Sequence, residues 1–325
     1  MKAWVFLAAV AALTGQTQPQ VENAAVDSRP LAGSLKTQFA AFGAGPYWAA
    51  WQEPIVPGRR GDNWCEYASG APLRLEGPVA LLIPVRIDNA PIDNEQVDQL
   101  RVASPDCRFD AGGLPFHWLT GVPPAESIAW LKTQISEKSP DRALSAIAEH
   151  AGPAAQQALE ELTASTQTEH IRSKAAFWLG SSRGAQGVAA LKRMLANDAS
   201  PNVREQVVFA LSLSKEPEAI AIMIDAAKND RTPRVRSKAL FWLAQKAANK
   251  AAEDAIRNAT LNDPDRSVKE QAVFALKQLP ANQGIPLLID VAKNNPDSAI
   301  RKKAIFWLGE SNDPRALDYF ANVLR

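Results

Sequence analysis

The residues that could carry catalysis or bind a metal are few in this chain of 325 residues. It has three histidines, His117, His150 and His170, and two cysteines, Cys65 and Cys107. The histidines do not stand at the spacing of a zinc or iron site, and no phosphate-binding loop, dinucleotide-binding glycine pattern or nucleophile elbow occurs. A hydrolase triad built in space from distant N-terminal residues stays open as the alternative. The sequence therefore predicts no metal, no cofactor and no catalytic residues.

The first residues have the composition of a secretion signal. Lys2 supplies a positive charge, and residues 3–13 form an apolar run too short to span a bilayer stably. We expect residues 1–16 to be a signal peptide cleaved near Gly15, with an uncleaved anchor as the alternative. The mature protein is then exported, periplasmic or secreted, and has no membrane span.

Export would place both cysteines in an oxidising compartment. The simple inference is a disulfide between Cys65 and Cys107, and the alternatives are two free thiols or a metal pair. In the chain-entropy model, closing a loop of about 40 residues is worth on the order of 3–4 kcal/mol.

The N-terminal region differs in character from the rest of the chain. Residues 17–37 are polar and small, which predicts a flexible segment. Residues 38–122 are rich in proline, glycine and aromatic residues, and the alternation over residues 79–87 predicts a half-buried strand, with another near residues 100–102. We expect a small β-rich domain. Its tryptophans would form its core or a platform for a sugar or peptide: Trp48, Trp51 and Trp64.

A phenylalanine returns every 32 or 33 residues in the second half of the chain. Each copy is followed by Trp or Ala and then Leu, and each is preceded by a cation and a Val or Ile. The copies are Phe177, Phe209, Phe241, Phe274 and Phe306. A fixed period in this range is typical of stacked helical hairpins, in which neighbouring units bury a shared core. We expect residues 123–325 to form about six helix pairs.

The repeat resembles the HEAT family, in the variant found in phycobilisome lyases, and the arrangement resembles secreted bacterial HEAT-repeat proteins. In that family an Asp before the turn and an Arg in the second helix bond along the stack. Carried over, this ladder comprises Asp198, Asp230, Asp263 and Asn295 with Arg204, Arg236, Lys269 and Arg301. The resemblance implies a mostly α protein, an α-α superhelix preceded by the small β-rich, disulfide-containing domain. The related lyases and di-iron hydroxylases are disfavoured, because the chain lacks the paired His-Glu dipeptides of the hydroxylases and is predicted to be exported.

The repeats alternate in kind, with Trp after the Phe in one unit and Ala in the next. In the second helices, a polar residue lies three positions before each Phe: Lys174, Gln206, Lys238, Gln271 and Lys303. We predict that this row and the Phe row form a groove for a segment of a partner protein, unless the Phe rings are buried between helices. Glutamates at the three lysines should then abolish partner capture without lowering the melting temperature.

The charge balance excludes one class of partner. Lys and Arg number 36 and Asp and Glu 35, so the net charge of +1 provides no field for nucleic acid. The sequence predicts a non-catalytic protein-interaction scaffold of the bacterial cell envelope. An enzyme with its site in the N-terminal domain is the alternative, and the partner's identity and the oligomeric state are not determined by the sequence.

Overall fold

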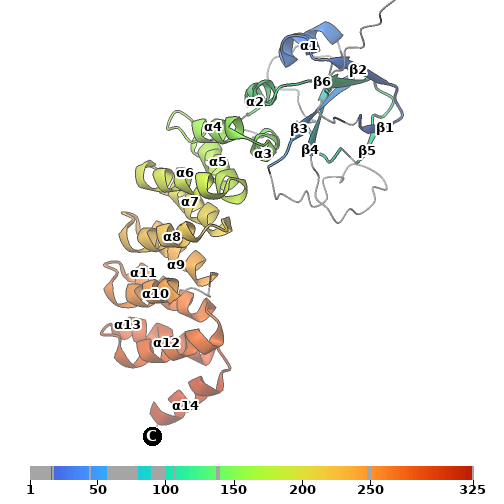
Figure 1. The fold of residues 1–325 in the computed structure, drawn as a ribbon. Helices are drawn as coiled ribbons and strands as arrows, with labels where there is room; N and C mark the ends of the chain where they lie inside the picture. The colour runs from blue at the N-terminus through green and yellow to red at the C-terminus, as the bar shows by residue number, and fades with distance from the viewer. Residues whose placement is uncertain are drawn as a thin grey trace, which may run out of the picture. The chain divides into compact units, whose positions relative to one another are not determined.

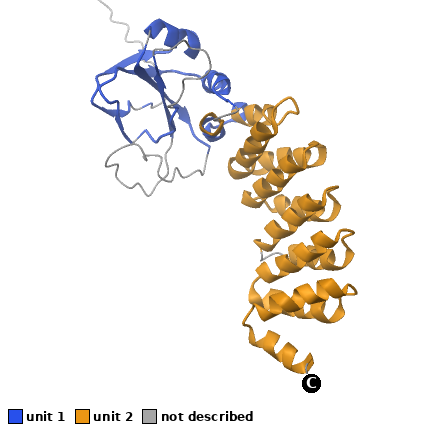
Figure 2. Ribbon diagram, turned by 180° about the vertical axis from the view of Figure 1, so that it is seen from behind, with its two compact units in different colours: residues 1–136, 145–154 blue, residues 137–144, 155–325 orange. Residues whose placement is uncertain are grey.

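The chain forms two compact units in a computed structural model that describes residues 16, 18–43, 45–56, 80–88, 100–105, 107–136, 140–246 and 250–323. The first unit comprises residues 1–136 and 145–154, and the second comprises residues 137–144 and 155–325 (Figure 2). The first contains a mixed sheet with helices, and the second is a stack of helices (Figure 1).

The first unit is built on a four-stranded sheet with the order β2-β6-β3-β4. β6 is parallel to both β2 and β3, whereas β3 and β4 are antiparallel, with Trp51 opposite Ile83. A separate parallel pair joins β1 and β5. The elements of this unit are β1 (Gln20–Glu22), β2 (Val26–Pro30), α1 (Leu35–Phe42), β3 (Tyr47–Pro54), β4 (Ala80–Ile87), β5 (Arg108–Asp110), β6 (Phe116–Thr120) and α2 (Pro124–Thr133).

Residues 17–37 are predicted to be flexible. Instead they contain β1, which pairs with β5, then β2, which pairs with β6, and the start of α1. β2 runs beside β6 from the pair Val26–Phe116 to the pair Pro30–Thr120. The prediction was wrong because these polar residues satisfy their backbone groups on strands far along the chain, which local composition does not reveal.

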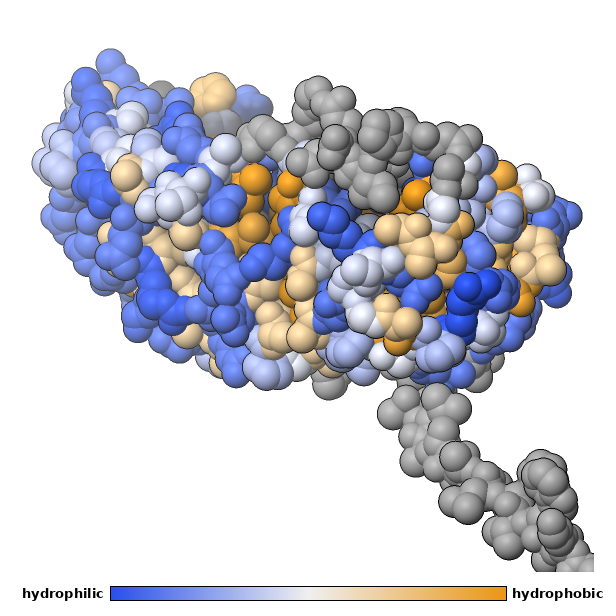
Figure 3. Space-filling model, turned by 90° about the horizontal axis from the view of Figure 1, so that it is seen from above, coloured by the Kyte–Doolittle hydropathy of each residue, from blue (hydrophilic) through white to orange (hydrophobic). Residues whose placement is uncertain are grey.

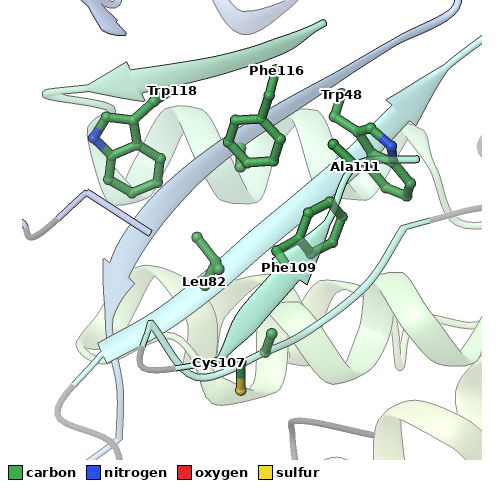
Figure 4. Close-up of a cluster of buried hydrophobic side chains, with 9 residues drawn as sticks. Trp48, Leu82, Cys107, Phe109, Ala111, Phe116 and Trp118 are labelled. Atoms are coloured by element: carbon green, nitrogen blue, oxygen red, sulfur yellow. The ribbon is translucent and has the colours of Figure 1, made fainter. Parts of the chain in front are cut away.

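Both faces of the central sheet are covered. On one face, aromatic residues from β3, β5 and β6 meet smaller side chains in a cluster (Figure 4). The cluster comprises Trp48, Ala50, Leu82, Ala103, Cys107, Phe109, Ala111, Phe116 and Trp118. On the other face, the Trp51 ring lies 6.4 Å from Phe39 of α1 and 5.5 Å from Trp130 of α2. Six consecutive residues of β4 are therefore buried, so the expectation of a half-buried strand was wrong.

The structure also bears on other predictions for this region. Trp48 and Trp51 are buried core residues rather than a platform. Residues 100–103 make isolated bridges to β4 and no named strand. Cys65 and Trp64 lie outside the described residues, so the disulfide stays a prediction.

The helix α2 belongs to the first unit, although its sequence predicts a place among the repeats. Trp130 packs edge-on against Trp51, and the Trp51 indole N–H donates to the Ser127 hydroxyl at 2.8 Å. These contacts to the sheet explain the difference, because an amphipathic helix joins whichever core covers its apolar face.

The second unit is an array of antiparallel helix pairs. Its helices are α3 (Asp141–Glu149), α4 (Pro153–Glu161), α5 (Glu169–Ser182), α6 (Gly184–Asn197), α7 (Pro201–Leu213), α8 (Pro217–Asn229), α9 (Pro233–Ala244), α10 (Lys250–Asn262), α11 (Arg266–Gln278), α12 (Ala281–Asn294), α13 (Ser298–Gly309) and α14 (Pro314–Val323). The division between the two units passes through α3 and α4. We call α5, α7, α9, α11 and α13 the second helices and α6, α8, α10, α12 and α14 the first helices.

The second helices lie side by side along the array, α5 against α7 and so on to α13. In α7 the positions Val203, Val207, Ala210 and Leu211 are all fully buried, which places one face in the shared core. The pairs approach closely. A Cβ atom on Gly284 of α12 would lie 2.4 Å from the Leu276 carbonyl oxygen of α11, so only glycine fits there.

Candidate functional site

A ladder of buried ion pairs joins successive repeats. Arg204 is fully buried, and its Nε and Nη2 hold the Asp230 carboxylate of the next repeat at 2.8 and 3.1 Å. Its Nη1 donates to the carbonyl oxygens of Asp198 and Ala199 in its own turn at 3.0 and 3.1 Å. One guanidinium therefore fixes both its own turn and the following repeat.

Two further arginines repeat this geometry. Arg172 holds Asp198 at 2.8 and 3.1 Å, and Arg236 holds Asp263 at 2.8 Å through both nitrogens. Bonding to Asp263 raises the pKa of Arg236. Each of these aspartates also accepts a backbone N–H two residues ahead, which closes the turn before the second helix.

The ladder changes between α11 and α12. Lys269 stands where the other repeats have Arg, and Asn295 stands where three of them have Asp. Asn295 still closes its turn, through a bond from the Asp297 N–H at 3.0 Å, but its Nδ2 donates to the Thr260 carbonyl at 2.9 Å. The bidentate ion pair of the other junctions is therefore absent at this one. A lysine ammonium cannot donate two parallel hydrogen bonds to a carboxylate as a guanidinium does.

Four rings of the phenylalanine row are half-buried rather than enclosed between helices, and the fifth, Phe306, is exposed. The Phe177 and Phe209 rings stack at 6.3 Å, and Phe209 meets Trp242 at 4.9 Å. Phe274 meets Trp307 at 5.2 Å. Trp242 and Trp307 thus pack on the Phe of the preceding, Ala-containing repeat, whereas Trp178 contacts Phe177 of its own repeat at 5.1 Å. One edge of the row is left at the surface, and there it can contact another molecule.

The polar row runs beside the aromatic row on the same surface. Gln206 and Lys238 are exposed, and Lys174, Gln271 and Lys303 are half-exposed. Lys174 already pairs with Asp141 at 2.8 Å, whereas Lys238 and Lys303 make no ion pair with the residues that the structure describes. We refer to these two rows, ten residues from the five second helices, as the candidate interaction surface.

A family model for HEAT repeats matches residues 157–244 and 253–325. The array is a HEAT-repeat solenoid. The resemblance drawn from the repeated Phe, Asp and Arg positions is thereby confirmed for this part of the chain. None of the curated proteins compared with the chain matches it.

Solved structures similar to the HEAT solenoid include two enzymes. The CpcE–CpcF complex of phycocyanin lyase from Nostoc sp. PCC7120 is 21% identical over 47% of this chain and 98% of that chain, with a TM-score of 0.36. Human deoxyhypusine hydroxylase is 16% identical over 61% of this chain and 90% of that chain, with a TM-score of 0.27. YibA of E. coli is 19% identical over 61% of this chain and 75% of that chain, with a TM-score of 0.37.

A buried hydrogen-bond chain in the first unit has the residue types of a hydrolase pair. The Ser127 hydroxyl lies 2.8 Å from His150 Nε2, and His150 Nδ1 lies 2.6 Å from the Ala146 carbonyl. Because that carbonyl can only accept, Nδ1 carries the proton and Nε2 accepts the Ser127 proton. Both side chains are fully buried, and the hydroxyl also accepts the Trp51 indole N–H. This geometry suits a structural bond, since a nucleophile must reach its substrate.

Glu53 lies in the same buried region. Its side chain is 1% exposed, and neither carboxylate oxygen has a hydrogen-bond partner among the described residues. Burial is the main cause that raises the pKa of Glu53, to about 8. The neighbouring Ser127 hydroxyl lowers this pKa to a smaller extent. The carboxyl group is therefore mostly protonated at neutral pH.

The other features that could bind a ligand are weaker. Across the described segments, no cluster of three or more His, Cys, Asp or Glu side chains could hold a metal ion, and none of the helices is long and apolar enough to cross a membrane. A groove of about 500 Å³ between α6 and α8 is bridged by the pair Lys192–Glu218 at 3.2 Å. Of its charged groups, Lys192, Glu218 and Asp230 are already in ion pairs and Arg231 donates to the Asp198 carbonyl, so the groove carries no assignment.

Proposed function

We propose that the protein is a non-catalytic adaptor of the bacterial cell envelope that binds a segment of a partner protein on its HEAT solenoid. The observation that carries the proposal is the candidate interaction surface, in which aromatic rings lie beside Lys and Gln side chains on five successive second helices. Aromatic anchors flanked by polar groups are typical of protein interfaces.

The ladder supports this role indirectly. Buried arginine–aspartate pairs hold each repeat to the next, so the rows keep a fixed spacing over three consecutive junctions. A rigid surface loses less conformational entropy when it binds a partner than a mobile one does.

The test is affinity capture with quantitative mass spectrometry from cells that make the protein. In one variant, glutamate replaces Lys174, Lys238 and Lys303. We expect this variant to lose its partner without a lower melting temperature, apart from the small effect of breaking the exposed Lys174–Asp141 pair. A matched variant carries glutamates at three exposed lysines outside the rows, Lys192, Lys215 and Lys228. Equal capture by both variants would refute the candidate interaction surface.

Export and the disulfide belong to the same proposal. We expect the mature protein to begin near Gln16 and to contain a Cys65–Cys107 bond, because an exported small domain gains stability from such a link. Mass spectrometry of the N-terminal peptide and of alkylated, unreduced protein checks both points. An intact Lys2 peptide, or two alkylated thiols, would remove this part of the proposal.

A further inference from the structure

Exposed apolar side chains gather on the last two helices of the solenoid. Most of the surface visible in Figure 3 is hydrophilic, with apolar residues in smaller patches. Four of the large apolar side chains that are exposed within the described residues lie on α13 and α14: Ile305 at 39%, Phe306 at 54%, Leu317 at 64% and Val323 at 63%. This concentration indicates a surface that other helices normally cover.

The repeat register shows that α14 presents core positions to solvent. Leu317 follows Leu308 at the same distance at which Ile285 follows Leu276 in the preceding repeat. Ile285 is 6% exposed, whereas Leu317 is 64% exposed. The same holds for Val323 and its counterparts Val291 and Met194, which are 4% and 6% exposed. In α6 and α12 these positions lie on helices that pack against a second helix, α7 or α13.

The adjoining position on α13 behaves in the same way. Ile305 precedes the repeat Phe, and the residues at this position in the other second helices are fully buried: Ala176, Val208, Leu240 and Val273. Each of those helices has another second helix beside it. Ile305, Leu317 and Val323 thus outline the place of one helix, which no described part of the chain occupies.

The ladder adds an electrostatic requirement at this place. Arg301 donates through Nη1 to the Asn295 carbonyl at 2.7 Å, as Arg204 and Arg236 do in their own turns. Its Nε and Nη2, the atoms that hold an aspartate in those repeats, make no hydrogen bond within the described residues. A carboxylate ahead of the incoming helix would satisfy them.

We propose that α13 and α14 form a docking surface for an α-helix of a partner protein. The helix places an apolar stripe on Ile305, Leu317 and Val323, and a carboxylate just before its first turn binds Arg301. Two arguments define this occupant. Its carboxylate complements the charge of Arg301, and its apolar stripe continues the packing that each repeat makes with the next. None of Ile305, Leu317, Val323 and Arg301 belongs to the two rows of the proposed function, so either idea can fail alone.

The chain itself supplies a probe for this surface. Residues 198–214 comprise Asp198, its turn and α7, which sit on α5 and α6 as the proposed helix would sit on α13 and α14. A peptide of this sequence, held helical by a lactam bridge because short helices are marginal in water, is titrated into the full-length protein. Fluorescence anisotropy gives the affinity, and hydrogen exchange of α14 reports protection without any label.

We expect saturable binding that Leu317→Asp weakens at least tenfold. Leu261→Asp is the matched control, because Leu261 is 40% exposed on α10. This control variant should bind the peptide with the same affinity as the unaltered protein. Arg301→Gln and an Asp198→Asn peptide should each weaken binding tenfold, with no further loss when the two changes are combined.

Three results would overturn the proposal. The first is that the bridged peptide shows no saturable binding and no protection of α14. The second is that the Leu317→Asp variant binds the peptide with unchanged affinity. Alternatively, sedimentation shows a dimer of the unaltered protein that Leu317→Asp makes monomeric, which would assign the surface to a second copy of the chain. Glutamates at the row lysines should leave peptide binding unchanged.

Discussion

Glu53 should make the stability of the first unit depend on pH in a direction opposite to that of most carboxylates. The group is buried without a hydrogen-bond partner among the described residues, and its pKa of about 8 lies above the ordinary value of 4.5. Between these two values the folded protein keeps a proton that the unfolded chain releases. The free energy of unfolding therefore falls as pH rises through this window.

The size of the effect follows from the two pKa values. At about 1.4 kcal/mol per pH unit, the span from 4.5 to about 8 corresponds to a loss on the order of 5 kcal/mol. The loss is complete only above pH 8, where the folded state also ionises. At pH 5 most of the stability is retained.

Glu53→Gln removes the titration while keeping the shape of the side chain. The amide still lacks partners, so we expect the variant to be less stable than the unaltered protein at pH 5 by about 1–3 kcal/mol. At pH 9 the order reverses, and the variant should be more stable by about 2–4 kcal/mol. The two stability curves therefore cross.

The assay is urea unfolding between pH 5 and pH 9 at constant ionic strength. Phenylalanines at Trp178, Trp242 and Trp307 remove the solenoid tryptophans, so the fluorescence reports the N-terminal region. Glu22→Gln is the control, since its side chain is 42% exposed in the same unit. If Glu53→Gln and the unaltered protein lose stability in parallel as pH rises, the reasoning is refuted.

Three further predictions concern buried polar groups. Asp230→Ala leaves a fully buried guanidinium without its carboxylate, and urea unfolding should show a loss of about 3–5 kcal/mol; a loss below 1 kcal/mol would contradict the ladder. Lys269→Arg and Asn295→Asp together rebuild the missing pair, so a double-mutant cycle should give a favourable coupling of about 1–3 kcal/mol, and additive effects would count against it. Ser127→Ala removes the hydroxyl between an indole N–H and an imidazole nitrogen and should cost about 2–5 kcal/mol by thermal unfolding, whereas an unchanged melting temperature would exclude a structural role for that bond.

The helical array could be predicted from the sequence because its signals are local and repeated. Phe209, Arg204 and Asp198 recur at fixed spacing, and each spacing describes one helix pair and its turn. The change of the ladder at Lys269 and Asn295 is also visible as two departures from the pattern. The new bond that Asn295 makes, to the Thr260 carbonyl, could be found only from the packed structure.

The first unit was predicted less well because its determinants are distant in sequence. β2 is polar, and it becomes a strand only through its pairing with β6. Glu53 looks like an ordinary strand-end carboxylate until α2 covers that face of the sheet. Likewise, the pattern of Leu317 and Val323 predicts a core-facing helix side, and only the comparison of exposure between repeats reveals that it is open.

The alternation of Trp and Ala constrains how such a protein can change length. Trp242 rests on Phe209, and Trp307 rests on Phe274, so each bulky residue has a small neighbour one repeat away. Deleting a single Ala-containing repeat would set two tryptophan-bearing helices against each other and overfill the space between them, and deleting the Trp242 repeat would set two alanine-bearing helices together and leave a cavity. Removing or duplicating two repeats keeps the pairing. Lineages that lengthen or shorten this array are therefore expected to do so in steps of two repeats.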